Sequence, residues 1–124
     1  AAQGLDAVLL PAHSVPAMPH YTSGDFTLGL SYAFRYTFLN FPAGIVPVTR
    51  VQQADADAIS AGGDRVEKKQ AEIEKSAVGL PSGVQLVARP FREDLVLALL
   101  AAVEARVREN DDFPTTPIQP GVVG

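Results

Sequence analysis

Three short apolar runs, each beside a proline or a glycine, alternate along this chain with three stretches of helical periodicity. The runs cover residues 7–10, 45–51 and 83–88. Runs of this length, rich in valine, leucine and isoleucine, are typical of strands buried on both faces. Strands that alternate with helices favour an α/β fold in which the helices cover a sheet. Pro47, inside the second run, indicates an edge strand, a bulge or a strand boundary.

The three helical stretches differ in character. Residues 27–39 are aromatic and amphipathic, and Pro42 ends the helix that they predict. Residues 64–76 interleave lysines with glutamates, which predicts a surface helix with its first residue, Asp64, near the N-cap. In residues 92–108, acids open the segment, arginines close it and an apolar stripe recurs at helical spacing. The stripe consists of Leu95, Val96, Leu99, Leu100, Val103 and Val107.

Three strands cannot by themselves satisfy the hydrogen-bonding groups on both edges of a sheet. We therefore expect this α/β segment to be incomplete alone and to belong to a larger mixed central sheet flanked by helices. The chain begins without methionine, almost directly at its first apolar run. We therefore also expect a further portion of the protein upstream of this sequence.

Charge and composition remove several classes of function. The formal net charge of −4 provides no basic face of the kind that neutralises nucleic-acid phosphates. The absence of cysteine excludes disulfides, cysteine-ligated zinc and thiol nucleophiles. Without a membrane-length apolar run or a signal peptide, we expect a soluble, cytoplasmic protein. Membrane association of the full protein stays open.

Isolated motifs supply no catalytic residue, no metal ligand and no cofactor site. His13 and His20 lie seven residues apart in a proline-rich loop, which matches neither a helical i, i+4 pair nor a common zinc spacing. No serine occupies a Gly-x-Ser-x-Gly elbow or a Ser-x-x-Lys arrangement. Lys75, beside Ser76, lies in a charged segment where it should stay protonated and too weak a base to activate the hydroxyl.

Two apolar features leave two interpretations open. Thr27, Leu30 and Phe34 share one side of the expected helix, where they would line a ligand pocket or, as the pattern alone favours, pack in an ordinary core. Phe91 lies at a junction between a loop and a helix, where it would guard a pocket or pack against the helix that follows.

Several motifs occur together in one order along the chain. They are Ser31-Tyr32, the stretch 40–48 with Asn-Phe-Pro-Ala-Gly, a charged segment, and the stretch 79–93 followed by an amphipathic helix. This block resembles the fatty acid amide hydrolases of the amidase-signature family. The resemblance implies that residues 1–109 form the C-terminal part of an amidase-signature domain, with 52–77 as a charged surface insertion. The proline-containing residues 110–124 are expected to be an extended or disordered tail.

Members of that family hydrolyse amide C–N bonds with a Ser–cis-Ser–Lys triad, in which a neutral lysine activates the nucleophilic serine through a second serine. The triad belongs upstream of the block found here, and no segment of this chain matches it. The resemblance therefore implies no catalytic residue and no activity for these residues alone. It also implies two partners, the upstream catalytic portion and a small-molecule amide.

By the same resemblance, Thr27, Leu30, Phe34 and Phe91 become substrate-contacting positions of an acyl channel. The family often has tryptophan where this chain has Phe91 and smaller aliphatic residues where it has Phe34, so a narrower or shorter channel is expected. Two alternatives remain: a stand-alone, non-catalytic binding module that self-associates through exposed strands as a homo-oligomer, and an amidotransferase-type amidase subunit. The charged insertion resembles the fatty-acid-amide branch more.

Overall fold

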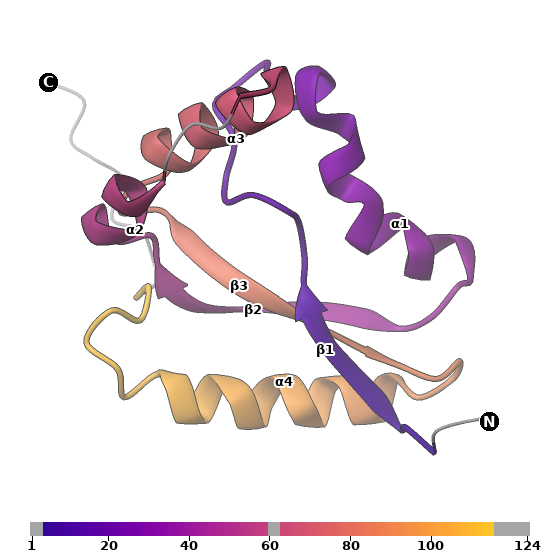
Figure 1. Cartoon of the computed structure of the whole chain (residues 1–124). Helices are drawn as coiled ribbons and strands as arrows, with labels where there is room; N and C mark the ends of the chain where they lie inside the picture. Colours follow the sequence, from indigo (N-terminus) through magenta and orange to yellow (C-terminus); the bar gives the residue numbers. More distant parts are fainter. Residues whose placement is uncertain (1–3, 60–62, 116–124) are drawn as a thin grey trace, which may run out of the picture.

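The computed structural model describes residues 4–59 and 63–115. Its centre is a three-stranded antiparallel sheet in the order β1-β3-β2. The strands are β1 (Ala7–Pro11), β2 (Ala43–Arg50) and β3 (Pro81–Ala88), and the helices are η1 (Ser23–Leu30), α1 (Ser31–Phe38), α2 (Gln53–Ala58), α3 (Arg65–Ser76) and α4 (Glu93–Val107). Helix α4 lies along one side of the sheet, and α1, α2 and α3 lie on the other (Figure 1). The α/β prediction is confirmed.

The central strand β3 carries the most continuous burial of the sheet. Residues 85–88 are all buried, because β3 has a strand on each side. The edge strand β1 is different: Val8 and Leu9 keep 39% and 57% of their surface exposed. The expectation that residues 7–10 are buried on both faces is therefore wrong for this chain, since α4 packs mainly on β2 and β3.

Strand β2 contains the irregularity that its proline predicts. The register of β2 on β3 shifts between Pro47 and Thr49, which marks a bulge, and β2 is also an edge strand. Proline has no N–H to donate to a ladder, so both positions suit it. Opposite Pro47 lies Gly83, where an added Cβ would come within 2.6 Å of the Val46 carbonyl oxygen. Only glycine fits there.

Helix α4 packs its apolar stripe on the sheet, as its periodicity predicts. Val96 is buried, and the other five residues of the stripe are half-buried. The helix approaches β2 closely at Gly44, where an added Cβ would collide with the Leu100 side chain. The helix predicted over residues 92–108 is confirmed.

The helix predicted over residues 27–39 is wrong in its first part. The chain forms the 3₁₀ segment η1 before the α-helix α1 starts at Ser31. Phe26 has non-helical backbone angles (φ −131°, ψ 38°), and the Thr27 hydroxyl donates to the Gly24 carbonyl at 3.1 Å. Such local side-chain bonds compete with the backbone bonds of an α-helix. Helix α1 itself has no buried residue among those described.

The charged segment forms the surface helix that was predicted, but it also supplies part of the core. Asp64 caps α3 by accepting a hydrogen bond from the Glu67 N–H at 2.8 Å. Within the same helix, Ile73 is fully buried and Ala71 is nearly so. Helix α3 packs against α2, whose Ala56 is also buried. A few small and aliphatic side chains thus suffice to anchor a helix rich in charge.

After α4 the chain turns back toward β2. The Thr49 hydroxyl donates to the Asp112 carboxylate, and Pro114 is buried. This packing differs from a freely extended tail as far as Thr115, and residues 116–124 of the expected tail lie outside the described part. Within the described ranges, no helix is both long enough and apolar enough to cross a membrane.

Candidate functional site: an apolar hollow between β2 and α4

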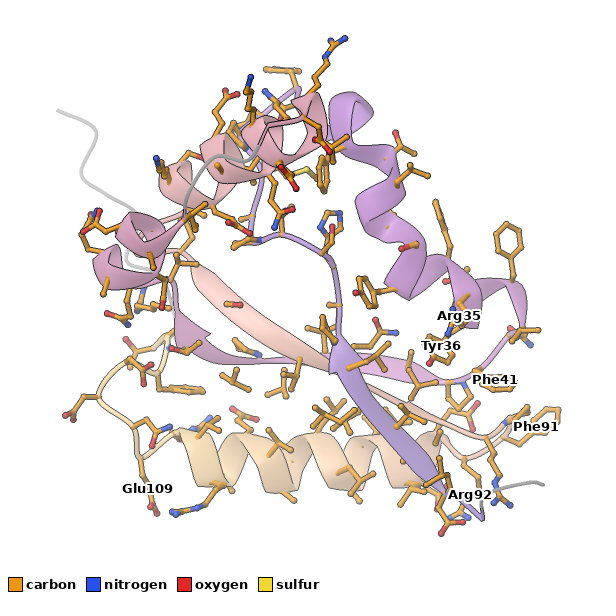
Figure 2. The ribbon with its side chains drawn as sticks, viewed as in Figure 1. Arg35, Tyr36, Phe41, Phe91, Arg92 and Glu109 are labelled. Atoms are coloured by element: carbon orange, nitrogen blue, oxygen red, sulfur yellow. The ribbon has the colours of Figure 1, made fainter. Side chains whose placement is uncertain are left out.

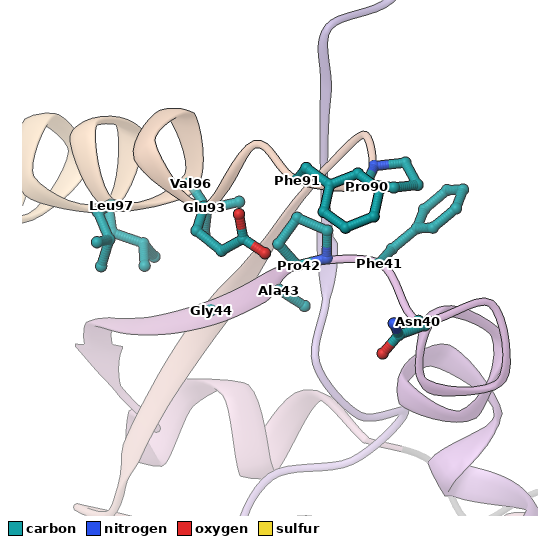
Figure 3. A pocket seen from close by; sticks show the side chains of 11 residues that line it. Asn40, Phe41, Pro42, Ala43, Gly44, Pro90, Phe91, Glu93, Val96 and Leu97 are labelled. Carbon is teal, nitrogen blue, oxygen red and sulfur yellow. The ribbon is translucent and has the colours of Figure 1, made fainter.

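A hollow of about 390 Å³ lies where β2 and α4 both begin (Figure 3). The antiparallel pairing of Ala43 with Val87 brings the start of β2 next to the end of β3, and the Ala88 N–H donates to the Pro42 carbonyl at 3.1 Å. The lining is mainly apolar and includes Phe41, Pro42, Pro90, Phe91, Val96, Leu97 and Leu100. Its volume falls in the range of small-molecule pockets.

Phe91 occupies an unusual backbone conformation at the rim. The Arg92 N–H donates to the Arg89 carbonyl at 3.2 Å, and Pro90 and Phe91 are the central residues of this turn. Phe91 has a φ of 63°, the sign that the third position of a type II turn requires and that glycine or asparagine usually supplies. For an aromatic residue this conformation costs about 1–2 kcal/mol. Burial does not explain it, because the Phe91 side chain is 88% exposed.

The hollow has one carboxylate in its lining, that of Glu93. The neighbouring acid, Asp94, is already engaged: Arg92 Nε donates to it at 2.9 Å, and this hydrogen bond lowers the pKa of Asp94 below its ordinary value. Glu93 has no ion pair within the part of the chain that the structure describes. In Figure 3 its carboxylate points toward Pro42.

Of the four substrate positions inferred from resemblance, only Phe91 lines this hollow. Thr27 is exposed in η1 and lines a separate hollow with Phe26 and Val66. Leu30 is half-buried where η1 meets α1. Phe34 is 45% exposed, and its ring lies 6.1 Å from that of Phe38. The structure therefore does not gather the four residues around one pocket within this chain.

Two lining residues, Phe41 and Glu93, were not among the predicted site residues. Phe41 lies in the loop just before β2, and Glu93 is the first residue of α4. Phe41, like Phe91, is next to a proline in the sequence. In Figure 2 the labelled Phe41 and Phe91 lie near each other at the same end of the molecule. An aromatic residue next to a proline at the start of a strand or helix was the sequence signal that could have identified Phe41 as a lining residue. That signal does not show which such positions lie together in the folded chain.

The histidines remain apart from this hollow. His13 Nδ1 lies 3.2 Å from the Val15 N–H nitrogen, and its Nε2 is buried without a partner among the described residues. His20 is exposed, with its ring 6.2 Å from that of Tyr21. In residues 4–59 and 63–115, no group of three or more histidine, aspartate or glutamate side chains is placed to hold a metal ion.

The fold and the hollow define an α/β protein with an apolar pocket at one end of its sheet. A model of the Amidase family matches residues 1–97, and the chain belongs to this family. The resemblance inferred from the ordered motifs is confirmed.

Two curated relatives are fatty acid amide hydrolases by name. The chain is 37% identical over 106 residues to fatty acid amide hydrolase 1 of Caenorhabditis elegans, a match covering 83% of this chain. It is 40% identical over 104 residues to fatty-acid amide hydrolase 1 of Sus scrofa, covering 81% of this chain. In both cases the match spans 18% of the relative, so the chain covers under a fifth of the length of these relatives.

Proposed function

We propose that this chain forms the C-terminal part of an amide hydrolase that cleaves linear amide C–N bonds, of the fatty-acid-amide type. The observation that carries the proposal is the identity of 37% and 40% to two proteins named fatty acid amide hydrolase, over more than four fifths of this chain. In this proposal a Ser–cis-Ser–Lys triad lies upstream, and the present residues are inactive without it. The protein's partners are then its own catalytic portion and a small-molecule amide.

The contribution of this chain is structural and substrate-binding. Its strands extend a larger mixed sheet, and its two exposed edges are suited to that pairing. Thr27, Leu30 and Phe34, which share no pocket with Phe91 in this chain, would form an acyl-pocket wall with it once the remaining domain is in place. The substantial exposure of Phe34 and Phe91 supports this arrangement, since large apolar side chains are more favourable when covered.

The first test is covalent labelling of the protein made from its native gene with a serine-reactive fluorophosphonate, followed by intact mass. We expect a species much heavier than a 124-residue chain that gains a single phosphonyl group. A nucleophilic serine activated by a neighbouring base reacts in this way, whereas an ordinary hydroxyl does not. An unlabelled protein of this chain's length would contradict the proposal and leave a non-catalytic module.

Leu30→Trp in the complete, unlabelled enzyme tests the acyl-wall assignment. Because the larger side chain would shorten the channel, kcat/KM for a long-acyl amide should fall about tenfold more than for a short-acyl amide. The control is Lys75→Trp, since Lys75 is an exposed, charged residue of the surface helix α3 and lines neither the hollow of Phe91 nor that of Thr27. Equal loss for long and short substrates would mean general disruption and would reject the assignment.

A self-associating, non-catalytic module is a second candidate, favoured by the exposed apolar side chains of the edge strand β1. Exposed strand edges of this kind pair readily with a second chain. Sedimentation of the native protein, together with the labelling above, separates the candidates. A dimer without a reactive serine favours self-association. A monomer without a reactive serine that unfolds cooperatively favours a stand-alone module.

A further inference from the structure

The hollow between β2 and α4 combines aromatic rings with a single carboxylate. We propose that it binds an organic cation, namely an ammonium group carried on an apolar body. This inference goes beyond the proposed hydrolase function: it shares Phe91 with the proposed acyl wall, but it depends on the lining of the hollow and on none of the triad residues.

The aromatic part of the lining suits a cation. Phe41 and Phe91 border the hollow from two different junctions of the chain. The face of an aromatic ring carries negative charge density and attracts an ammonium group. Phe41 is supported by Tyr36, whose ring centre lies 6.3 Å away, whereas the Phe91 ring has no aromatic partner among the described residues. No other ring of the described part of this chain therefore occupies the face of Phe91.

The charge of the lining also favours a cation. Glu93 is the acid that lines the hollow, and the arginines next to it in sequence have other partners. Arg92 donates to Asp94 at 2.9 Å, and Arg89 donates to the Leu5 carbonyl at 3.0 Å and 2.8 Å. Glu93 lies in the first turn of α4, the end of a helix at which the helix dipole favours a negative charge. Glu93 thus offers an uncompensated negative charge.

The remaining lining accommodates the apolar body and disfavours other ligands. Val96 and Leu100 of α4 provide an aliphatic floor that is buried or half-buried. A neutral apolar molecule would gain this burial but no charge interaction, and an anion would be repelled by Glu93 and by the ring faces. An apolar ammonium ion is the class that uses every part of the lining.

The test is a titration of the protein from its native gene with benzyltrimethylammonium, with benzyl alcohol and phenylacetate as neutral and anionic counterparts. Binding is followed by NMR shifts of the Val96 and Leu100 methyl groups. We expect the cation to bind at least tenfold more tightly than the alcohol, and phenylacetate to bind least. Glu93→Gln should weaken binding of the cation about tenfold and leave binding of the alcohol unchanged, which also shows that the hollow is intact.

The matched control is Glu67→Gln. Glu67 is likewise an exposed first-turn acid, in α3, and has no ion pair within the described ranges. This variant should not change binding of the cation. Equal affinity for cation and alcohol, no methyl shift with the cation, or no effect of Glu93→Gln would overturn the proposal. The outcome does not depend on fluorophosphonate labelling, so failure of this inference and failure of the hydrolase proposal are separately visible.

Discussion

Gly83→Ala is expected to destabilise the protein by about 3 kcal/mol, the upper end for over-packing. The new Cβ would lie 2.6 Å from the Val46 carbonyl oxygen and 3.2 Å from the Pro47 Cα. Both neighbours are backbone atoms of the paired strand, so no side chain can rotate away to relieve the contact. The strand pair must separate locally, and the bulge in β2 lies at this point. The ladder therefore loses hydrogen bonds as well as packing.

Urea unfolding of the purified protein measures this effect. Gly63→Ala is the control, because an added Cβ at Gly63 meets no atom within 4 Å and the residue is exposed. Surface substitutions of this kind usually stay within about 0.5 kcal/mol of the parent protein. If Gly83→Ala unfolds at the same urea concentration as Gly63→Ala, the close approach of β2 and β3 is not present in solution.

Ile73→Ala should cost about 2–5 kcal/mol of unfolding free energy, the range for truncating a large buried aliphatic side chain. Ile73 has no exposed surface, and it lies in a helix otherwise rich in lysine and glutamate. The loss combines the transfer free energy of three carbons with the cavity that they leave. A charged helix with few apolar anchors has little other packing to compensate.

Val66→Ala provides the comparison within the same helix. Val66 is 59% exposed, so its truncation should change stability by less than about 0.5 kcal/mol. Thermal or urea unfolding of both variants under identical conditions makes the comparison. Similar destabilisation by the two substitutions would show that α3 does not pack through Ile73 and is only a solvated surface helix.

Segments with a strong local signal were predicted well. The three strands occur where short apolar runs predicted them, and α4 extends over nearly all of the expected range. Asp64 caps α3 as its residue type indicates. In each case the deciding information lies within a few neighbouring residues, through side-chain periodicity or a local hydrogen bond.

Burial was predicted less well, because it depends on which element covers which. The apolar run of β1 looks like a core strand, yet β1 forms an edge of the sheet and keeps Val8 and Leu9 exposed. Ile73 occupies a charged segment that looks solvated, yet it is one of the two largest fully buried side chains. Composition describes a segment, whereas burial is a property of its contacts.

By itself, the sequence determined the amidase-family membership and the alternation of the three strands with the helices α1, α3 and α4, but not η1 or α2. Only the tertiary structure decided that Phe91 shares a hollow with Phe41 and Glu93, and that Thr27, Leu30 and Phe34 do not line it within this chain. Residues 41 and 91 lie fifty positions apart and meet because β2 pairs antiparallel with β3. Local backbone preferences are encoded by adjacent residues, but such a meeting depends on strand register, which the chain settles only when the sheet assembles.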